Sequence, residues 1–194
     1  RGDFDVLSVS PDGGATDPLS AADGDEFGLW SPDGLRIAFA RKVGEKTTIW
    51  VKTLDGGELR QITTEGREIP RAWSPDGREI LYTSDRTGKN DVWVLPVDGG
   101  APRQVTREVR DDWEPTYSPD GKWIAYLSEA GGQVDVWIVS SAGGQPMRVT
   151  NDAGAAPSAE SLRADPFLGM QMSMTRREAD GSRANDRPFL PAKC

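Results

Sequence analysis

One five-residue phrase recurs three times in this chain at nearly constant intervals. It reads Trp-Ser-Pro-Asp-Gly at residues 30–34 and 73–77, and Tyr-Ser-Pro-Asp-Gly at residues 117–121. The interval from Pro32 to Pro75 is 43 residues, and the interval from Pro75 to Pro119 is 44. A repeat of this length, with turn signals between aromatic strands, is typical of one blade of a β-propeller. The repeat therefore predicts an all-β fold.

Each complete repeat is expected to form four strands, bounded by glycine and proline turns. The first repeat places them at residues 27–31, 35–40, 47–53 and 58–63. The second repeat places them at residues 71–74, 79–84, 91–95 and 102–106. The third repeat places them at residues 116–118, 123–128, 135–140 and 146–150.

The predicted architecture is a β-propeller fragment of about three complete four-stranded blades, with a partial N-terminal blade and a degenerate C-terminal one. Residues 3–20 fit the last two strands of a preceding blade, at 3–10 and 15–20. The complete blades are expected within residues 27–63, 71–106 and 113–150, and residues 151–194 form a degenerate or disordered blade-like tail. Propellers usually have four to eight blades. Further blades or domains of the same parent chain are therefore expected, and the chain opens at Arg1 without a signal region.

The turns have a conformational explanation. In Ser-Pro-Asp-Gly, proline presets φ for the first corner, aspartate tolerates the second, and glycine takes the positive φ at the exit. Glycine pairs supply the left-handed corners of the second hairpin in each repeat. The residues predicted to build these turns are Pro32, Asp33, Gly34, Gly57, Pro75, Asp76, Gly77, Gly100, Pro119, Asp120, Gly121 and Gly144.

The third and fourth strands of each repeat differ in character. The third strand carries Trp50, Trp93 or Trp137 inside an apolar run, which indicates a strand covered on both faces by stacked blades. These tryptophans are therefore predicted to be core residues rather than ligand-stacking ones. The fourth strand carries an arginine and, in two repeats, Pro102 or Pro146. Proline and cationic residues protect an exposed sheet edge, so the fourth strand is predicted at the outer rim.

Several kinds of chemistry are excluded by residue content. The chain has no histidine, so it cannot assemble a Ser-His-Asp triad, and it lacks the Gly-x-Ser-x-Gly nucleophile elbow. Without histidine and with one cysteine, Cys194, ordinary zinc sites are excluded. Residues 85–91 resemble a calcium loop superficially but place Arg86 and Lys89 among the potential ligands, so a turn explains them better. No catalytic residue, metal or cofactor is predicted.

The net charge of -8 disfavours nucleic acid and anionic membranes as partners. No apolar run approaches the 18 or so residues of a membrane span.

Four short motifs recur in a fixed order within residues 3–150. After Trp-Ser-Pro-Asp-Gly come Ile-Ala-Phe or Ile-Ala-Tyr at 37–39 and 124–126, Asp-Val-Trp-Val at 91–94, and Asp-Gly-Gly followed by Arg-Gln-Val-Thr at 103–106. This set resembles the WD-like repeat of the TolB propeller family. The resemblance implies a six-bladed parent ring in the bacterial periplasm that binds partner proteins of the Tol–Pal envelope system. A periplasmic or secreted location is expected on the same basis.

Similar repeats also occur in tricorn-type proteases and in the propellers that gate the active sites of prolyl oligopeptidase-like peptidases. The resemblance therefore leaves two functions open: a protein-interaction scaffold, or the substrate-gating propeller of a serine peptidase whose catalytic domain is not in this chain. The second predicts a following α/β segment with an elbow serine and a histidine. A third possibility, a sugar- or polysaccharide-degrading propeller enzyme, requires a catalytic histidine or paired carboxylates, which the sequence does not offer.

The connections between repeats predict where a partner binds. Two turns keep their length and nearly the same sequence in every repeat. The sequences of the other connections vary, at 41–46, 64–69, 85–90, 107–114 and 129–133. In an up-and-down blade these connections emerge on one face, and variable loops on a rigid scaffold often carry recognition. Trp113 is included because it precedes an inner strand in an acidic loop, where it can be exposed. The candidate partner-binding residues are Arg67, Glu68, Arg86, Lys89, Arg110, Asp111, Asp112 and Trp113.

Overall fold

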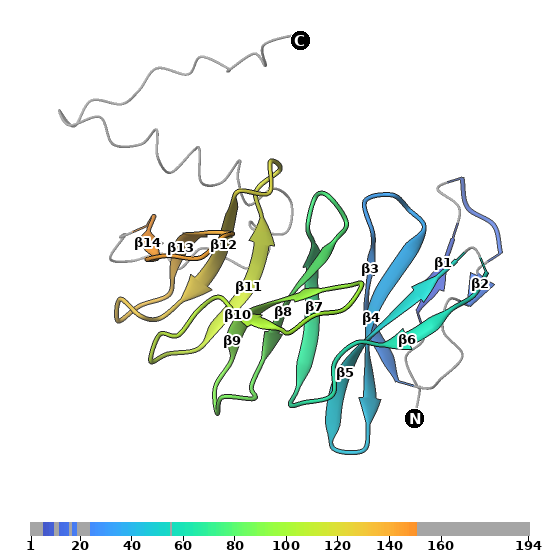
Figure 1. Cartoon of the computed structure of the whole chain (residues 1–194), viewed down its shortest axis with the longest axis horizontal. Coiled ribbons are helices and arrows are strands. Elements are labelled where there is room, and N and C mark those ends of the chain that lie inside the picture. Colours follow the sequence, from blue (N-terminus) through green and yellow to red (C-terminus); the bar gives the residue numbers. More distant parts are fainter. Residues whose placement is uncertain (1–5, 10–11, 16, 19–23, 55, 151–194) are drawn as a thin grey trace, which may run out of the picture. The chain divides into compact units, whose positions relative to one another are not determined.

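The computed structural model describes residues 6–9, 12–15, 17–18, 24–54 and 56–150, and every regular element in these residues is a β-strand (Figure 1). Three four-stranded antiparallel sheets follow one another along the chain, as the repeat predicts. The first blade contains β3 (Asp25–Trp30), β4 (Arg36–Val43), β5 (Lys46–Thr53) and β6 (Leu59–Gln61). The second contains β7 (Glu68–Trp73), β8 (Glu79–Ser84), β9 (Asp91–Pro96) and β10 (Arg103–Gln104). The third contains β11 (Asp112–Tyr117), β12 (Trp123–Ser128), β13 (Asp135–Ser140) and β14 (Met147–Arg148).

A two-stranded antiparallel sheet precedes the first blade. It consists of β1 (Leu7–Ser8) and β2 (Asp17–Pro18), which lie within the two strands expected at residues 3–10 and 15–20. Gly13 and Gly14 both have positive φ, at 82° and 122°, like the glycine pairs of the later hairpins. The remaining parts of those two expected strands lie partly outside the described residues, as does the whole expected tail at 151–194.

Strand order within each blade follows chain order, so the fourth strand is an edge strand in all three sheets, as predicted. Its arginine also connects neighbouring blades. Arg103 donates a hydrogen bond to the carbonyl oxygen of Ser141 in the third blade, over 2.7 Å. Arg60, 43 residues earlier, donates in the same way to the carbonyl oxygen of Val97 in the second blade. The edge arginines therefore protect an edge and link one blade to the next.

Hydrogen bonds explain why serine, aspartate and glycine recur in the first turn. In the second blade, the Ser74 hydroxyl donates to the Asp76 carboxylate over 2.6 Å and accepts from the Glu79 amide over 2.9 Å. The amide of Gly77 donates to the Ser74 carbonyl, and Gly77 has φ of 70°. The hydrogen bond from Ser74, with a second from the Arg78 amide, lowers the pKa of Asp76. The corresponding turns of the other two blades have the same hydrogen bonds.

The apolar core lies between the faces of consecutive blades. Between the first and second blades it contains Ala38, Ile49, Val51, Trp73, Ile80, Tyr82, Leu95 and Val97. Between the second and third blades it contains Leu81, Val92, Val94, Val105, Tyr117, Ile124, Tyr126 and Val139. Burial of these faces against one another, rather than within a single sheet, gives the stacked blades most of their hydrophobic stabilisation.

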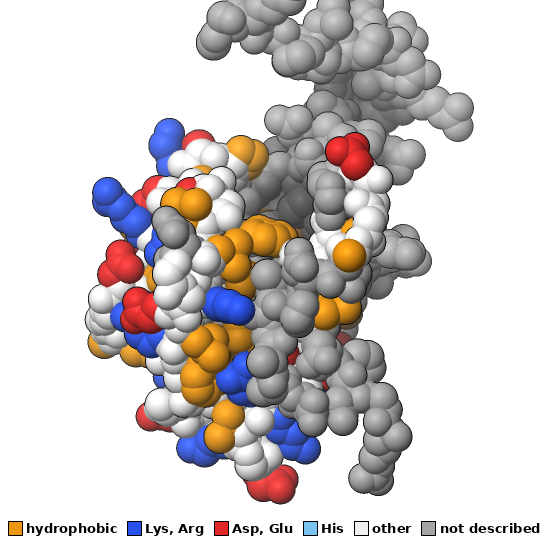
Figure 2. Space-filling model, turned by 90° about the vertical axis from the view of Figure 1, so that its right-hand side faces the viewer, with side chains coloured by type: hydrophobic (Ala, Val, Ile, Leu, Met, Phe, Trp, Pro, Cys, Tyr) orange, Lys and Arg blue, Asp and Glu red, His pale blue; other side chains and the backbone are white. Residues whose placement is uncertain are grey.

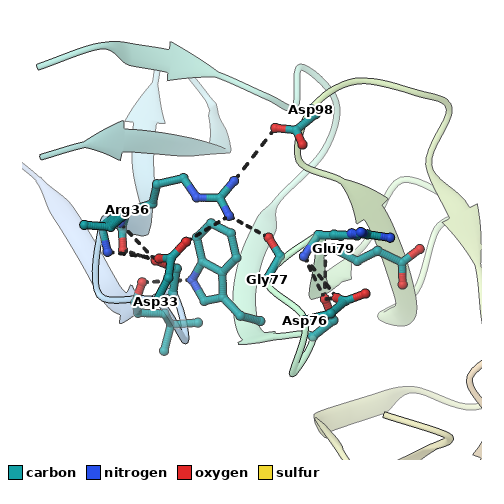
Figure 3. Close-up of polar contacts among 12 residues, drawn as sticks. Asp33, Arg36, Asp76, Gly77, Glu79 and Asp98 are labelled. Atoms are coloured by element: carbon teal, nitrogen blue, oxygen red, sulfur yellow. Dashed lines mark hydrogen bonds and ion pairs between the residues drawn. The ribbon is translucent and has the colours of Figure 1, made fainter. Parts of the chain in front are cut away.

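A polar junction also links the first two blades (Figure 3). The Arg36 guanidinium donates to the carbonyl oxygen of Gly77 over 2.8 Å and lies 5.0 Å from the centre of the Trp73 ring. The Trp73 indole nitrogen donates to the carbonyl oxygen of Leu29 in the first blade, over 3.0 Å. These contacts cross from one sheet to the next, so they fix the position of the second blade against the first.

On its other face the first blade has less cover from the described residues, where Val6 packs against Ile37 and Phe39. Trp30 is 50% exposed, whereas its repeat equivalent Trp73 is 7% exposed. Leu54 is 37% exposed, whereas its equivalent Val97 is 1% exposed. Figure 2 views the molecule from the side of β1 and β2 and shows apolar side chains among lysine and arginine side chains. The difference arises because Trp73 and Val97 lie beneath a complete blade.

The innermost strands begin earlier than the sequence predicts. The third blade begins at Asp112 rather than at residue 116, so Trp113 belongs to β11 and pairs with Leu127. The register shifts between Trp113 and Thr116, where Glu114 has φ of 49° and Pro115 follows. This β-bulge accommodates a proline and an acidic residue inside a strand, and such composition otherwise indicates a loop.

Candidate protein-interaction face

The two ends of the blades differ in construction. One end carries the Ser-Pro-Asp-Gly turns and the glycine-pair turns, and we call it the turn face. The other end carries the connections at residues 44–45, 62–67, 85–90, 105–111 and 129–134, and we call it the loop face. Antiparallel order within each blade places all these connections together. All eight predicted partner-binding residues lie in these connections or at the strand ends beside them.

Three of the eight predicted residues are exposed on the loop face. They are Arg67, Arg110 and Asp111. The amide of Arg67 donates to the Asp85 carboxylate over 2.7 Å, so its backbone is held while its side chain reaches solvent. Beside Arg110, Val109 is 91% exposed. An exposed apolar residue next to charged ones is a common composition for a recognition surface.

Glu68 and Arg86 instead form a largely buried pair. Glu68 begins β7 and is fully buried, and the Arg86 guanidinium forms an ion pair with its carboxylate. Arg86 also donates to the Tyr82 hydroxyl over 3.1 Å and lies 4.6 Å from the centre of the Trp93 ring. Burial raises the pKa of Glu68, and Thr63 and Arg86 offset part of this effect. These two residues stabilise the blade. Only Arg86 of the pair is partly exposed, so a partner can contact the pair only at this side chain.

Two further carboxylates hold the loops in place. Lys89 forms an ion pair with Asp91, which begins β9 and is fully buried. The carboxylate of Asp111 accepts a hydrogen bond from the amide of Asn90 over 2.8 Å, so one loop is held by the next. Lys89, which is partly buried, and Asp111, which is exposed, therefore each have an anchoring role as well as access to solvent.

Asp112 and Trp113 are not in an exposed loop. Both belong to β11, where Asp112 is fully buried and Trp113 is half-buried. Among the described residues, neither carboxylate oxygen of Asp112 has a hydrogen-bond partner. Burial raises the pKa of Asp112, and the hydroxyls of Ser128 and Thr106 offset part of that effect.

Position within the repeat could have revealed the buried acids. Asp25, Glu68 and Asp112 follow one another at intervals of 43 and 44 residues, and each begins an innermost strand. A residue type that recurs at one repeat position indicates a structural role. Asp25 was not predicted as a site residue, although it forms two hydrogen bonds of 2.7 Å with Arg41.

A threonine at the end of each blade holds the loop face together. The Thr63 hydroxyl accepts a hydrogen bond from the amide of Ile49 over 2.7 Å. Thr106 and Thr150 accept in the same way from the amides of Val92 in β9 and Val136 in β13, each over 2.9 Å. The sheets are therefore closed by the same contact beneath loops of different sequence.

Within the described residues, no cluster of three or more acidic, histidine or cysteine side chains is placed to hold a metal ion. The same part of the chain contains no helix with the length and apolar character of a membrane span. A cavity of about 90 Å³ lies on the turn face, lined by residues that include Arg36, Arg60 and Asp98. Pockets for small organic ligands have volumes of roughly 300–1,000 Å³, so this cavity is too small for one.

Comparison with known proteins places these observations in a family. The profile of the TolB beta propeller domain matches residues 12–183. The chain belongs to the TolB β-propeller domain family. The profile extends past the described residues into the tail expected at 151–194. No protein with a curated description matches the chain.

Solved structures of TolB share the fold. A protein assigned as TolB from Agrobacterium tumefaciens is 29% identical, with a TM-score of 0.61, over 78% of this chain and 63% of that one. TolB from Acinetobacter baumannii is 23% identical, with a TM-score of 0.63, over 74% of this chain and 37% of that one. This TolB-type chain therefore spans less than two thirds of the length of either protein. A structure from a study of two prolyl endopeptidases is 18% identical, with a TM-score of 0.61, over 79% of this chain and 27% of that one.

Proposed function

We propose that this TolB-type propeller chain is a non-catalytic scaffold that binds protein or peptide partners through its loop face. The difference between the two faces carries the proposal. The turn face repeats one set of hydrogen bonds in every blade, whereas the connections of the loop face differ in sequence. Arg67 is exposed in one connection, and Val109, Arg110 and Asp111 are exposed in the next. A periplasmic or secreted location, inferred from the family, accompanies this function.

The surface chemistry supports a polypeptide partner. The exposed loop-face residues include arginines of flexible reach, an aspartate and an apolar side chain, held on backbone that is itself hydrogen-bonded. Arginine and apolar groups on a rigid support contribute strongly to protein interfaces.

The test uses two charge-reversal variants of equal net charge. Arg67→Glu/Arg110→Glu changes the loop face, and Arg78→Glu/Lys122→Glu changes exposed residues of the turn face. Peptides selected by display against the unaltered chain are measured for affinity to both. We expect the loop-face variant to bind the peptides at least about tenfold more weakly than the unaltered chain. The turn-face variant should keep the peptide affinity, and both variants should keep the melting temperature. Equal losses in both variants would contradict the assignment to the loop face.

The similarity to prolyl endopeptidase structures supports a second candidate, a propeller that gates substrate access to a serine peptidase domain. This function requires a hydrolase domain outside the chain. The reading frame that encodes the chain distinguishes the two candidates. A continuous α/β segment with an elbow serine and a histidine favours the gating propeller, and further blades without such a segment favour the scaffold.

A further inference from the structure

A buried acid, an aromatic ring and a tryptophan surround an arginine in the second blade. The Arg86 guanidinium forms an ion pair with Glu68, donates to the Tyr82 hydroxyl, and lies 4.6 Å from the centre of the Trp93 ring. The centre of the Tyr82 ring is 5.8 Å away. Glu68, Tyr82 and Trp93 therefore form a cage around a guanidinium group, and they combine charge pairing with cation–π contact.

The first blade builds the same cage from the same repeat positions. Arg41 donates two hydrogen bonds of 2.7 Å to the Asp25 carboxylate. Its guanidinium lies 4.7 Å from the centre of the Trp50 ring and 5.3 Å from the centre of the Phe39 ring. Arg41 comes from the second strand, whereas Arg86 comes from the loop after it. Arginines at two different repeat positions therefore place a guanidinium group in the equivalent cages of the first two blades.

The third blade keeps the cage residues but has no arginine at either position. Asp112, Tyr126 and Trp137 each follow their second-blade equivalents by 44 residues. Ser128 occupies the position of Arg41, and Ala130 occupies the position of Arg86. The acid and the first ring remain buried, at 0% and 1% exposure.

The polar atoms of this third cage are poorly satisfied among the described residues. Both oxygens of Asp112 and the Tyr126 hydroxyl are buried and form no hydrogen bond of ordinary geometry there. The hydroxyls of Ser128 and Thr106 offset only part of the effect of burial on Asp112, and within this part of the chain no cation pairs with its carboxylate as Arg86 pairs with Glu68. One oxygen of Glu68 is also unpartnered, so the contrast between the blades lies in the second oxygen and the phenol. A buried, unpaired carboxylate is costly, which makes the third cage receptive to a cation.

We propose that Asp112, Tyr126 and Trp137 form a binding site for a guanidinium group, supplied by an arginine of a polypeptide partner. In assigning the group to a partner, this inference rests on the proposed function. A guanidinium fits because its plane stacks on tryptophan while its edge pairs with a carboxylate. The described residues offer no set of three or more metal-binding side chains here or elsewhere.

The neighbouring charges and the approach are consistent with this site. Lys89 and Asp91 act on Asp112 through their charges, and Glu108 acts on Tyr126, but Lys89 is already paired with Asp91. Trp137 is half-buried, and Ala130 is exposed on the loop face. An incoming arginine therefore approaches over the repeat position from which Arg86 enters its own cage.

The experiment titrates N-acetyl-arginine amide into the 194-residue chain and follows the indole N–H of Trp137 by NMR, with Trp137→Phe to assign the signal. We expect a saturable shift, with weaker binding of N-acetyl-lysine amide. Asp112→Asn should weaken arginine binding by about tenfold or more, because it removes a charge-assisted hydrogen bond. No saturable shift, or an equal shift in Asp112→Asn, would overturn the proposal.

A second variant supplies the missing group within the chain. Ala130→Arg is expected to fill the third cage, raise the melting temperature and abolish the titration, whereas Ala130→Gln does neither. If Ala130→Arg binds arginine amide as the unaltered chain does, the cage is not the site.

Peptides from the display experiment separate this inference from the proposed function. If arginine amide binds but the display experiment selects no peptide, the result supports the cage as a guanidinium site and contradicts the proposed scaffold function. Peptides that bind the loop face equally in Asp112→Asn support the scaffold and contradict the cage as its arginine site.

Discussion

The guanidinium of Arg36 in the first blade lies over the ring of Trp73 in the second, 5.0 Å from its centre (Figure 3). In the next pair of blades, Glu79 and Tyr117 occupy the same repeat positions, and the tyrosine hydroxyl donates to the glutamate over 3.2 Å. Different residue types at the same two repeat positions therefore form a contact between neighbouring blades in both cases.

We expect Arg36→Met to lower the free energy of unfolding by about 1–2 kcal/mol, since it removes a charge-assisted hydrogen bond to Gly77 but leaves apolar contact with Trp73. Asp98→Asn is the matched control. It breaks only a 3.8 Å ion pair with an 84% exposed carboxylate, and exposed pairs contribute little. Urea unfolding measures both variants, and equal losses would contradict the importance of the Gly77 contact.

Two turn glycines separate backbone strain from side-chain crowding. Gly34 and Gly77 both have φ of 70°. A Cβ atom at Gly34 meets nothing within 4 Å, whereas one at Gly77 lies 3.3 Å from the Arg36 guanidinium. Gly34→Ala should therefore cost about 1 kcal/mol from left-handed strain, and Gly77→Ala should cost more. Thermal unfolding tests the order, and a smaller loss in Gly77→Ala would refute it.

Removal of one member of a buried ion pair should be strongly destabilising. Arg86→Met leaves Glu68 buried without its cation, and we expect a loss of about 3 kcal/mol in the free energy of unfolding. Adding Glu68→Leu should restore most of that loss. Arg67→Met, on the same face but exposed, should change stability by less than about 0.5 kcal/mol. No recovery in the double variant would show that Arg86 acts through another contact.

Acid should weaken the turn face. Serine hydroxyls lower the pKa values of Asp33, Asp76 and Asp120 below their ordinary value of 3.8. Their stabilising contribution is therefore complete above about pH 4 and is lost as the pH falls through the lowered values. Asp76→Asn should lower stability more at pH 7 than at pH 2.5, as measured by urea unfolding. Asp98→Asn, an exposed change of equal charge, should show a smaller difference between the two pH values.

Glu68 and Asp112 should give the opposite pH dependence of stability, because burial raises their pKa values. Each binds its proton more readily in the folded chain, so each contributes more stability as the pH falls toward the unfolded-state value near 4. Asp112→Asn should therefore reduce this gain, and comparison with Asp76→Asn separates the two opposing effects.

The repeat made the blades predictable because glycine and proline determine turns through local conformation. Gly77 needs a positive φ whatever surrounds it, and the sequence alone shows this. The ends of the innermost strands were less predictable. Trp113 lies among acids and next to the bulge at Glu114 and Pro115, where local composition indicates a loop although the strand continues.

The burial of charged residues was also beyond local reasoning. Glu68 is accommodated by Arg86, which is distant in sequence, and by the rings that surround this arginine. The contact with Arg86 shows that Glu68 is a buried structural acid. In the sequence, the signal for this role was the recurrence of an acid at the same repeat position.

Thr63, Thr106 and Thr150 close their sheets beneath the variable connections. Substitutions, insertions or deletions in those connections can therefore accumulate without loosening the strands below. Over evolutionary time, such a framework can acquire a new binding specificity while it retains its thermal stability.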